Sequence, residues 1–254
     1  MKIRILGSGT SSGVPRIGND WGACDPNEPR NRRTRVSALV EHDDTRILID
    51  TGPDMREQLL AADVATVDAV LWTHDHADHC HGIDDLRQLF HNQGATVRGF
   101  ARAETLTSLK ARFDYVFAGR QGYRATVTAD VLPDRMTLGS IKLGCTDQPH
   151  GSILSAGLRF DVVGKSIGYA TDFSAVTPAM IDLYRGVDIL VVDALRIAPH
   201  PTHPSLAEAL AFARTCQAGR TVLIHMDHSM DYATLCAMLP DGVEPGYDGL
   251  ELTL

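Results

Sequence analysis

The stretch from Thr73 to His79 is the part of the chain richest in side chains that bind metals. It reads Thr-His-Asp-His-Ala-Asp-His, so three imidazoles and two carboxylates occupy six consecutive positions. Imidazole and carboxylate are groups that divalent transition metals favour in proteins. A solvated charged surface would instead carry lysine and glutamate at helical spacing. The stretch therefore predicts a metal site.

A buried strand is expected to position these side chains. Residues 67–72 form an apolar run that indicates such a strand, and α/β proteins bind ligands at strand ends. His74 and His76 are two residues apart, so near-extended backbone would point both to one side. Asp78 and His79 follow the turn and are placed to face a second ion.

Further donors are expected at the ends of other strands, because two adjacent ions need about seven or eight donors. His150 follows a predicted strand at 141–145, Asp172 ends one at 167–171, and His225 ends one at 221–224. Taken singly, such a histidine is most often structural, and such an aspartate most often belongs to a turn or a helix cap. Spacing alone leaves both interpretations open.

The composition argues against several classes of protein. A net charge of −8 over 254 residues is unfavourable for an extended nucleic-acid surface. No apolar run reaches the ~20 residues of a membrane span, and the first residues do not form a signal-peptide core. Five cysteines without paired spacing suit reduced thiols. The cytoplasm is therefore the expected location.

The order of predicted elements indicates one layered α/β domain over residues 1–254, since no repeat or linker divides it. A long loop from Gly7 to about Pro29 has little periodicity, which is often a sign of a functional segment. The predicted strands are 2–6, 36–41, 45–50, 67–72, 125–131, 141–145, 154–163, 166–170, 187–192, 221–224 and 250–254. The predicted helices are 53–60, 84–91, 104–110, 178–184, 205–215 and 231–239, the fifth starting with a capping box.

The donors in their order resemble the metallo-β-lactamase superfamily. Further segments make the chain similar to PhnP-type phosphodiesterases, which hydrolyse phosphoribosyl 1,2-cyclic phosphate in bacterial phosphonate metabolism. These segments are Leu6–Pro15, Asn31–Arg35, Ile49–Pro53, Thr202–Leu206 and His225-Met226-Asp227-His228. The resemblance runs from about Leu6 to Asp231.

This resemblance implies the fold and the metal ligands. The expected fold is an αββα sandwich of two mixed β-sheets with outer helices. Each ion would be held by a triad of donors. Asp172 would bridge the two ions, and Asp75 would bind neither. The triads are His74, His76 and His150, and Asp78, His79 and His225. Two divalent cofactor ions per chain are expected, and both zinc and manganese suit these donors.

The resemblance also implies a reaction. A hydroxide bridging the two ions would attack the phosphorus of a small phosphodiester, such as the cyclic phosphate that the family hydrolyses. His203 is the candidate general acid, although a histidine at a helix start can simply contact backbone. Asp78 is expected to take part in catalysis as well as to bind a metal ion.

Three residues are candidate contacts for the substrate phosphate. Arg33 and Arg35 belong to a cluster of four arginines, and guanidinium pairs well with phosphate. The alternative is a salt-bridged loop. Ser11 lies in the glycine-rich opening segment, where backbone N–H groups can bind anions.

The chain departs from the PhnP pattern at one place. Relatives often hold a structural zinc with three closely spaced cysteines and a late histidine. Here only Cys24 and His228 are left, and two donors do not close a tetrahedral site. No structural zinc is expected.

Three other functions compete with the phosphodiesterase. They are a tRNA 3′-processing nuclease, a hydrolase of another bond, and a non-catalytic metal-binding module. The expected partner is a small phosphate-ester substrate, without a membrane or an extended nucleic-acid surface. The oligomeric state is open, with a homodimer among the options.

Overall fold

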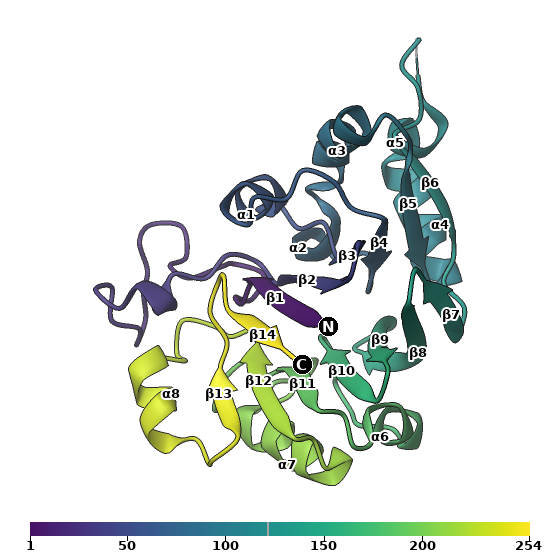
Figure 1. Ribbon diagram of the computed structural model, residues 1–254. Coiled ribbons are helices and arrows are strands. Elements are labelled where there is room, and N and C mark those ends of the chain that lie inside the picture. The colour runs from purple at the N-terminus through teal and green to yellow at the C-terminus, as the bar shows by residue number, and fades with distance from the viewer. Residues whose placement is uncertain (121) are drawn as a thin grey trace.

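Two β-sheets of seven strands each pack face to face in the computed structural model, which describes residues 1–120 and 122–254 (Figure 1). The first sheet has the order β14 (Glu251–Thr253), β1 (Lys2–Gly7), β2 (Ser37–His42), β3 (Thr45–Ile49), β4 (Ala69–Trp72), β5 (Val97–Ala101) and β6 (Val127–Val131). The second has the order β13 (Val243–Pro245), β12 (Arg220–Ile224), β11 (Ile189–Asp193), β10 (Lys165–Ala170), β9 (Ile153–Val162), β8 (Ile141–His150) and β7 (Arg135–Leu138).

Both sheets are mixed. Strands β3 to β6 are parallel to one another, as are β10 to β13, whereas the remaining neighbours are antiparallel. Ligand sites of α/β proteins lie at the carboxyl ends of parallel strands. The parallel parts of the two sheets therefore supply the edges at which a site can form.

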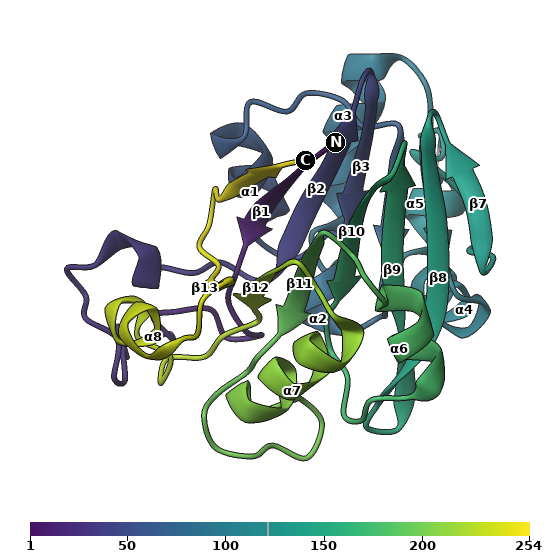
Figure 2. The same cartoon turned by 60° about the horizontal axis from the view of Figure 1, so that its bottom comes forward.

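Helices cover the outer face of each sheet (Figures 1 and 2). The first sheet carries α1 (Met55–Ala61), α3 (Leu86–Gln93), α4 (Ala103–Arg112) and α5 (Asp114–Ala118), and the second carries α6 (Pro178–Tyr184), α7 (Leu206–Cys216) and α8 (Tyr232–Met238). Between the sheets lies a core of side chains such as Ile5, Val40, Leu158 and Tyr169. The predicted αββα sandwich is confirmed.

Strand β8 is longer than the sequence predicts. The prediction ended it at Cys145, because Asp147, Gln148 and Pro149 are unfavourable in strands. In the structure it continues to His150, paired on one side with β9. The partner on its other side, β7, ends opposite Gly144, so the missing N–H of Pro149 costs no ladder hydrogen bond. His150 is thus the last residue of a strand.

Strands β5, β7 and β13 are absent from the predicted elements. In β5, Gly99 interrupts the strand pattern for a steric reason: a Cβ atom there would lie 2.4 Å from the ring of Trp72. Glycine in a strand marks such a close approach. The short strands β7 and β13 have too few residues to show a pattern.

The N-terminal loop (residues 8–35) is attached to the second half of the chain. The carboxylate of the half-buried Asp248 accepts hydrogen bonds from the backbone and hydroxyl groups of Ser8 and Thr34, at 2.6–2.8 Å. Figure 1 shows the loop beside α8. The two termini are also adjacent, since Leu254 donates to the carbonyl of Met1.

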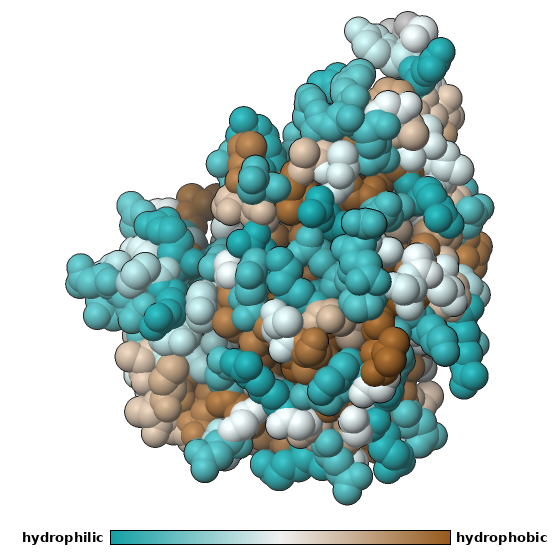
Figure 3. Space-filling view, viewed as in Figure 1, coloured by the Kyte–Doolittle hydropathy of each residue, from teal (hydrophilic) through white to brown (hydrophobic). Residues whose placement is uncertain are grey.

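The surface in Figure 3 mixes hydrophilic and hydrophobic residues, and its hydrophobic areas are small and separated. Such scattered areas are normal for a folded domain. None of the helices in residues 1–120 and 122–254 has the length and hydrophobicity needed to cross a membrane.

Asp231 caps α8 and holds the N-terminal loop. One of its oxygens accepts from the backbone N–H of Thr234 at 2.9 Å, and the other from the side-chain amide of Asn31 at 2.7 Å. Although desolvation opposes this, the hydrogen bonds lower the pKa of Asp231 to about 2. The folded-state pKa is therefore below the unfolded value, so the stabilisation is complete above about pH 4 and disappears as the pH falls through about 2.

Replacing Asp231 with alanine is expected to lower the free energy of unfolding by about 1–2 kcal/mol at pH 7. Urea unfolding at pH 7 and pH 3 would measure this, and the difference between variant and wild type should shrink at pH 3. An equal difference at both pH values would contradict the assigned role of the carboxylate.

Candidate metal centre

The predicted metal donors lie at the ends of strands from both sheets. His74 and His76 follow β4, and Asp78 and His79 lie in the short helix α2 (Ala77–Cys80) directly after them. The donors of the second sheet are at the ends of β8, β10 and β12, namely His150, Asp172 and His225. His76 is the N-cap of α2, and the other six donors lie in α2 or within two residues of a strand end.

Three residues of this region have left-handed backbone. These are Asp50 after β3, Asp172 after β10 and His225 after β12, with φ of 63°, 51° and 59°. Such a conformation costs about 1–3 kcal/mol for a residue other than glycine and persists only when its surroundings hold it. It turns each side chain out of its strand direction, and strained backbone of this kind clusters at functional sites.

The first group of donors is His74, His76, His150 and Asp172, whose ligand atoms lie within 4.8 Å of one another. The Nε2 atoms of His74 and His150 are 3.7 Å and 3.6 Å from Oδ2 of Asp172. His76 is exposed, whereas the other three side chains are buried. An ion here would be reached from the side of His76.

The second group is Asp78, His79 and His225, again within 4.8 Å. Asp172 is shared, because its Oδ1 lies 3.4 Å from Nε2 of His79 and its Oδ2 lies 3.6 Å from Nε2 of His225. One carboxylate therefore contacts donors of both groups. The family resemblance predicts that Asp172 bridges the two ions, and its position between the two groups fits that role.

The donor set fits divalent ions. The Nε2 atoms of His74, His79 and His225 are buried and have no hydrogen-bond partner among the described residues. Buried polar atoms without partners are costly unless something else binds them. Two ligands each ~2.1 Å from one tetrahedral ion lie about 3.4 Å apart, which is close to the 3.4–3.7 Å separations found here.

Hydrogen bonds on the far side of the imidazoles orient several ligands. Asp50 lies 2.7 Å from Nδ1 of His79 and also accepts from Thr73. The carbonyl of Thr202 lies 3.0 Å from Nδ1 of His150. Such contacts fix which ring nitrogen faces a metal. Asp50 is not among the residues predicted from the sequence, although it lies at the end of a predicted strand, as the predicted donors do.

Burial and mutual interaction shift the pKa values of the cluster in opposite directions. Burial, opposed by Asp172, lowers the pKa of His150 to about 4. Burial also opposes protonation of His225, but the carboxylates of Asp172, Asp193 and Asp78 raise its pKa to about 9. Despite its own burial, Asp172 has a pKa well below the usual value because His225 and His79 adjoin it. The carboxylates thus favour positive charge at His225, whereas His150 is neutral at pH 7.

A histidine–aspartate pair adjoins the metal donors. Nδ1 of His203, in the loop before α7, is 2.8 Å from Oδ2 of the fully buried Asp193 at the end of β11. The ring of His203 stacks on that of His225, with 4.7 Å between centroids. His203 was predicted from the sequence, whereas Asp193 was not, although its position at a strand end was a comparable signal.

The candidate phosphate contacts have different environments. Arg33 is 2% exposed, and its guanidinium is occupied by internal contacts with Cys24, Asn31 and two backbone carbonyls. The structure therefore contradicts its expected role as a phosphate contact. Arg35 is half-buried and pairs with Asp54 at 2.9 Å, and Ser11 is exposed.

Two further residues of the sequence analysis have structural partners. Asp75 turns away from the donor groups and bonds to Ser108 and Arg112 of α4. Cys24 is buried beside Arg33, and neither Cys24 nor His228 belongs to a group of metal donors in the described part of the chain. The lack of a structural zinc stays a prediction.

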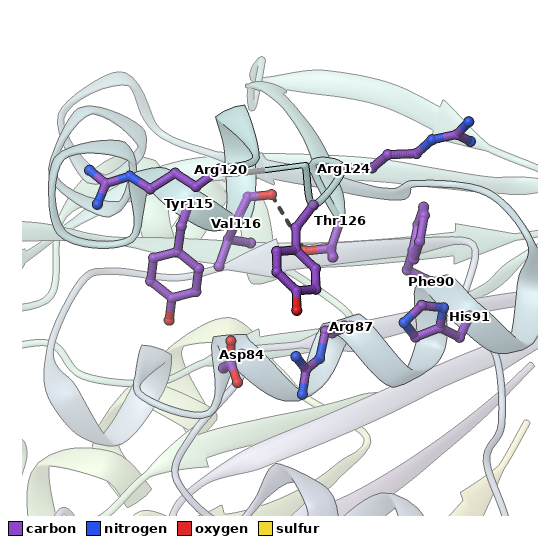
Figure 4. Close-up of a pocket in the computed structure, with 10 residues that line it drawn as sticks. Asp84, Arg87, Phe90, His91, Tyr115, Val116, Arg120, Arg124 and Thr126 are labelled. Atoms are coloured by element: carbon purple, nitrogen blue, oxygen red, sulfur yellow. Dashed lines mark hydrogen bonds between the residues drawn. The ribbon is translucent and has the colours of Figure 1, made fainter.

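A cavity of about 430 Å³ lies apart from this cluster, between α3 and the segment from α5 to the start of β6 (Figure 4). Arg87 and Phe90 line one side and Tyr115 and Val116 the other. None of its lining residues is a metal donor. The metal donors therefore form a separate site.

Comparison with known proteins agrees with this geometry. The model of the "Beta-lactamase superfamily domain" family matches residues 45–226. The chain is 32% identical over 261 residues to an octanoyltransferase of Porphyromonas gingivalis, covering 99% of the chain but only 51% of that protein. The chain thus spans about half the length of this curated relative.

Two solved structures are similar over the whole chain. A diphosphatase from the PhnP family is 37% identical, with a TM-score of 0.90 and coverage of 100% of this chain and 97% of that one. Zn²⁺-bound PqqB from Methylobacterium extorquens is 20% identical, with a TM-score of 0.80 and full coverage of both chains, which shows the shared fold. The chain belongs to the β-lactamase superfamily, as a PhnP-type, metal-dependent hydrolase with the metallo-β-lactamase fold.

Proposed function

We propose that the protein hydrolyses a small phosphodiester, such as phosphoribosyl 1,2-cyclic phosphate, with two divalent ions. The observation that carries this proposal is the position of Asp172 between two groups of donors whose buried Nε2 atoms lack hydrogen-bond partners. His74, His76 and His150 would hold one ion, and Asp78, His79 and His225 the other, with zinc and manganese both suited to this set.

When bound, the ions would lower the pKa of a shared water and offset the negative charge of the phosphate. The chain supplies the remaining groups. Asp193 accepts the hydrogen bond of His203 Nδ1, which leaves Nε2 as the atom that gives a proton to the departing alkoxide oxygen. The 2.8 Å contact also keeps the ring in one orientation.

The substrate class rests on two supports. A PhnP-family diphosphatase is 37% identical to this chain over its whole length. Hydrolysis of a diphosphate and hydrolysis of a phosphodiester both proceed by attack of water or hydroxide on phosphorus. The net charge of −8 favours a small substrate over extended RNA. A tRNA-processing nuclease is accordingly the second candidate.

Hydrolysis of bis-p-nitrophenyl phosphate, with and without Mn²⁺ or Zn²⁺ added to chelator-treated protein, tests the proposal. We expect metal-dependent release of nitrophenol. A panel containing a ribose cyclic phosphate, a dinucleoside diphosphate and tRNA then ranks the substrates by kcat/KM. Absence of metal-dependent turnover on every member would refute a phosphodiesterase, and preference for tRNA would favour the nuclease.

A further inference from the structure

Arg33 is a buried cation that uses its donors on backbone carbonyls. Nη2 donates to the carbonyl of Met230 at 2.6 Å and Nη1 to that of Asp227 at 3.3 Å. The same two nitrogens also donate to Cys24 and Asn31, at 3.9 Å and 3.3 Å, whereas the buried Nε has no partner among the described residues. Burying a guanidinium is costly unless its donors are used, so this arrangement indicates a specific role.

The two carbonyls belong to the segment that follows His225. The same segment is held on its other side by the N-terminal loop, since Met226 donates to Ser8 at 3.0 Å and accepts from Thr10 at 3.2 Å. Apart from a hydrogen bond between the backbone N–H of Asp227 and the carbonyl of Leu195, residues 226–230 are fixed mainly by the N-terminal loop. Within that loop, Arg33 contacts the segment at two carbonyls that are three residues apart, those of residues 227 and 230.

His225 lacks the outer hydrogen bond that orients two of the other histidine ligands. Nδ1 of His79 and His150 each has an outer partner within 3.0 Å. Neither ring nitrogen of His225 has a hydrogen-bond partner in the described part of the chain, and its Nδ1 is 3.8 Å from Asp193. Its backbone is also left-handed, with φ of 59°. Its imidazole is thus positioned by its backbone and by stacking against the rings of His79 and His203, and not by its own hydrogen bonds.

We propose that Arg33 is a positioning residue for the second metal ion and acts through His225. Its guanidinium holds residues 227 and 230, which keep His225 in the left-handed conformation that directs its imidazole to Asp78 and Asp172. This inference rests on the proposed dinuclear site, and it assigns Arg33 to the metal centre instead of to the substrate.

Calorimetric titration of the metal-free protein with Mn²⁺ tests the proposal without any substrate. Wild type should show two binding events. Arg33→Met should weaken one of them by ~10-fold or more, the effect typical of losing an outer contact of a ligand. Arg32→Met is the matched control, because Arg32 is exposed in the same loop and lies over the ring of Trp21. It should bind both ions as wild type does.

The double variant Arg33→Met/His225→Ala separates positioning from general loosening of the fold. If Arg33 acts through His225, the double variant should bind Mn²⁺ as His225→Ala alone does. Further weakening in the double variant, or wild-type affinity at both events in Arg33→Met, would overturn the inference. Arg33→Lys, which keeps the charge, supplies the same comparison if the methionine variant does not fold.

The two proposals fail in distinguishable ways. A wild-type protein that binds fewer than two ions would contradict the dinuclear site itself and with it the role of Arg33. Two events in wild type with no effect of Arg33→Met would contradict the role of Arg33 only.

Discussion

Replacing Asp172 with asparagine is expected to abolish hydrolysis and to reduce bound metal from two ions to less than one per chain. Its carboxylate lies between the two sets of donors, with Oδ1 near His79 and Oδ2 near His74 and His225. Asparagine has the same shape but lacks the negative charge that two adjacent cations require. Elemental analysis after dialysis against limited Zn²⁺, together with turnover of bis-p-nitrophenyl phosphate, would measure both effects.

Asp75→Asn is the control for this substitution. Asp75 is an aspartate of the same histidine-rich segment, but its carboxylate is directed to Ser108 and Arg112. It should keep two ions and most of its activity. Two firmly bound ions in the Asp172→Asn protein would refute the bridging role.

His203→Ala is expected to lower kcat by ~100-fold or more on a substrate with a poor leaving group, with the metal content unchanged. The reason is that an alkoxide needs a proton as it departs, whereas nitrophenolate leaves readily without one. The effect on bis-p-nitrophenyl phosphate should therefore be much smaller. Asp193→Asn should act in the same direction, because the amide cannot accept and orient the Nδ1 proton as the carboxylate does.

His200→Ala serves as the control, since its ring lies 5.3 Å from that of His203 and is only partly buried. Its turnover is expected to stay within a few-fold of wild type. Comparing kcat for an alkyl and an aryl phosphodiester in all three variants provides the test. An equal loss on both substrates in His203→Ala would argue against proton donation.

Local patterns predicted most of the fold. The helix α6 has its expected residues, and the strands of the hairpin β2–β3 agree with the predicted bounds to within one residue. In the capping box of α7, Ser205 and Glu208 bond to each other's backbone as the sequence indicated. These features depend on residues close together in the chain. The missed strand β5 depends instead on Trp72, which packs on Gly99 from another strand.

Most metal donors of the first sheet can be predicted from the local sequence, whereas the aspartates that orient histidines depend on the tertiary structure. His74, His76, Asp78 and His79 share one segment, so their chemistry is evident from residue type and spacing. Asp50 and Asp193 are single aspartates far from it, and their roles depend on contacts of 2.7 Å and 2.8 Å that only the folded chain creates.

The sequence by itself determined that this protein has a metal-binding loop after a buried strand and three further donors at strand ends. It did so because donor type and strand periodicity are local properties. Only the tertiary structure decided which arginine faces inward. Arg32 and Arg33 are neighbours of the same chemical type, yet one is exposed and the other is 2% exposed against the carbonyls of residues 227 and 230. Burial of this kind depends on segments almost 200 residues apart in the sequence, which no local pattern records.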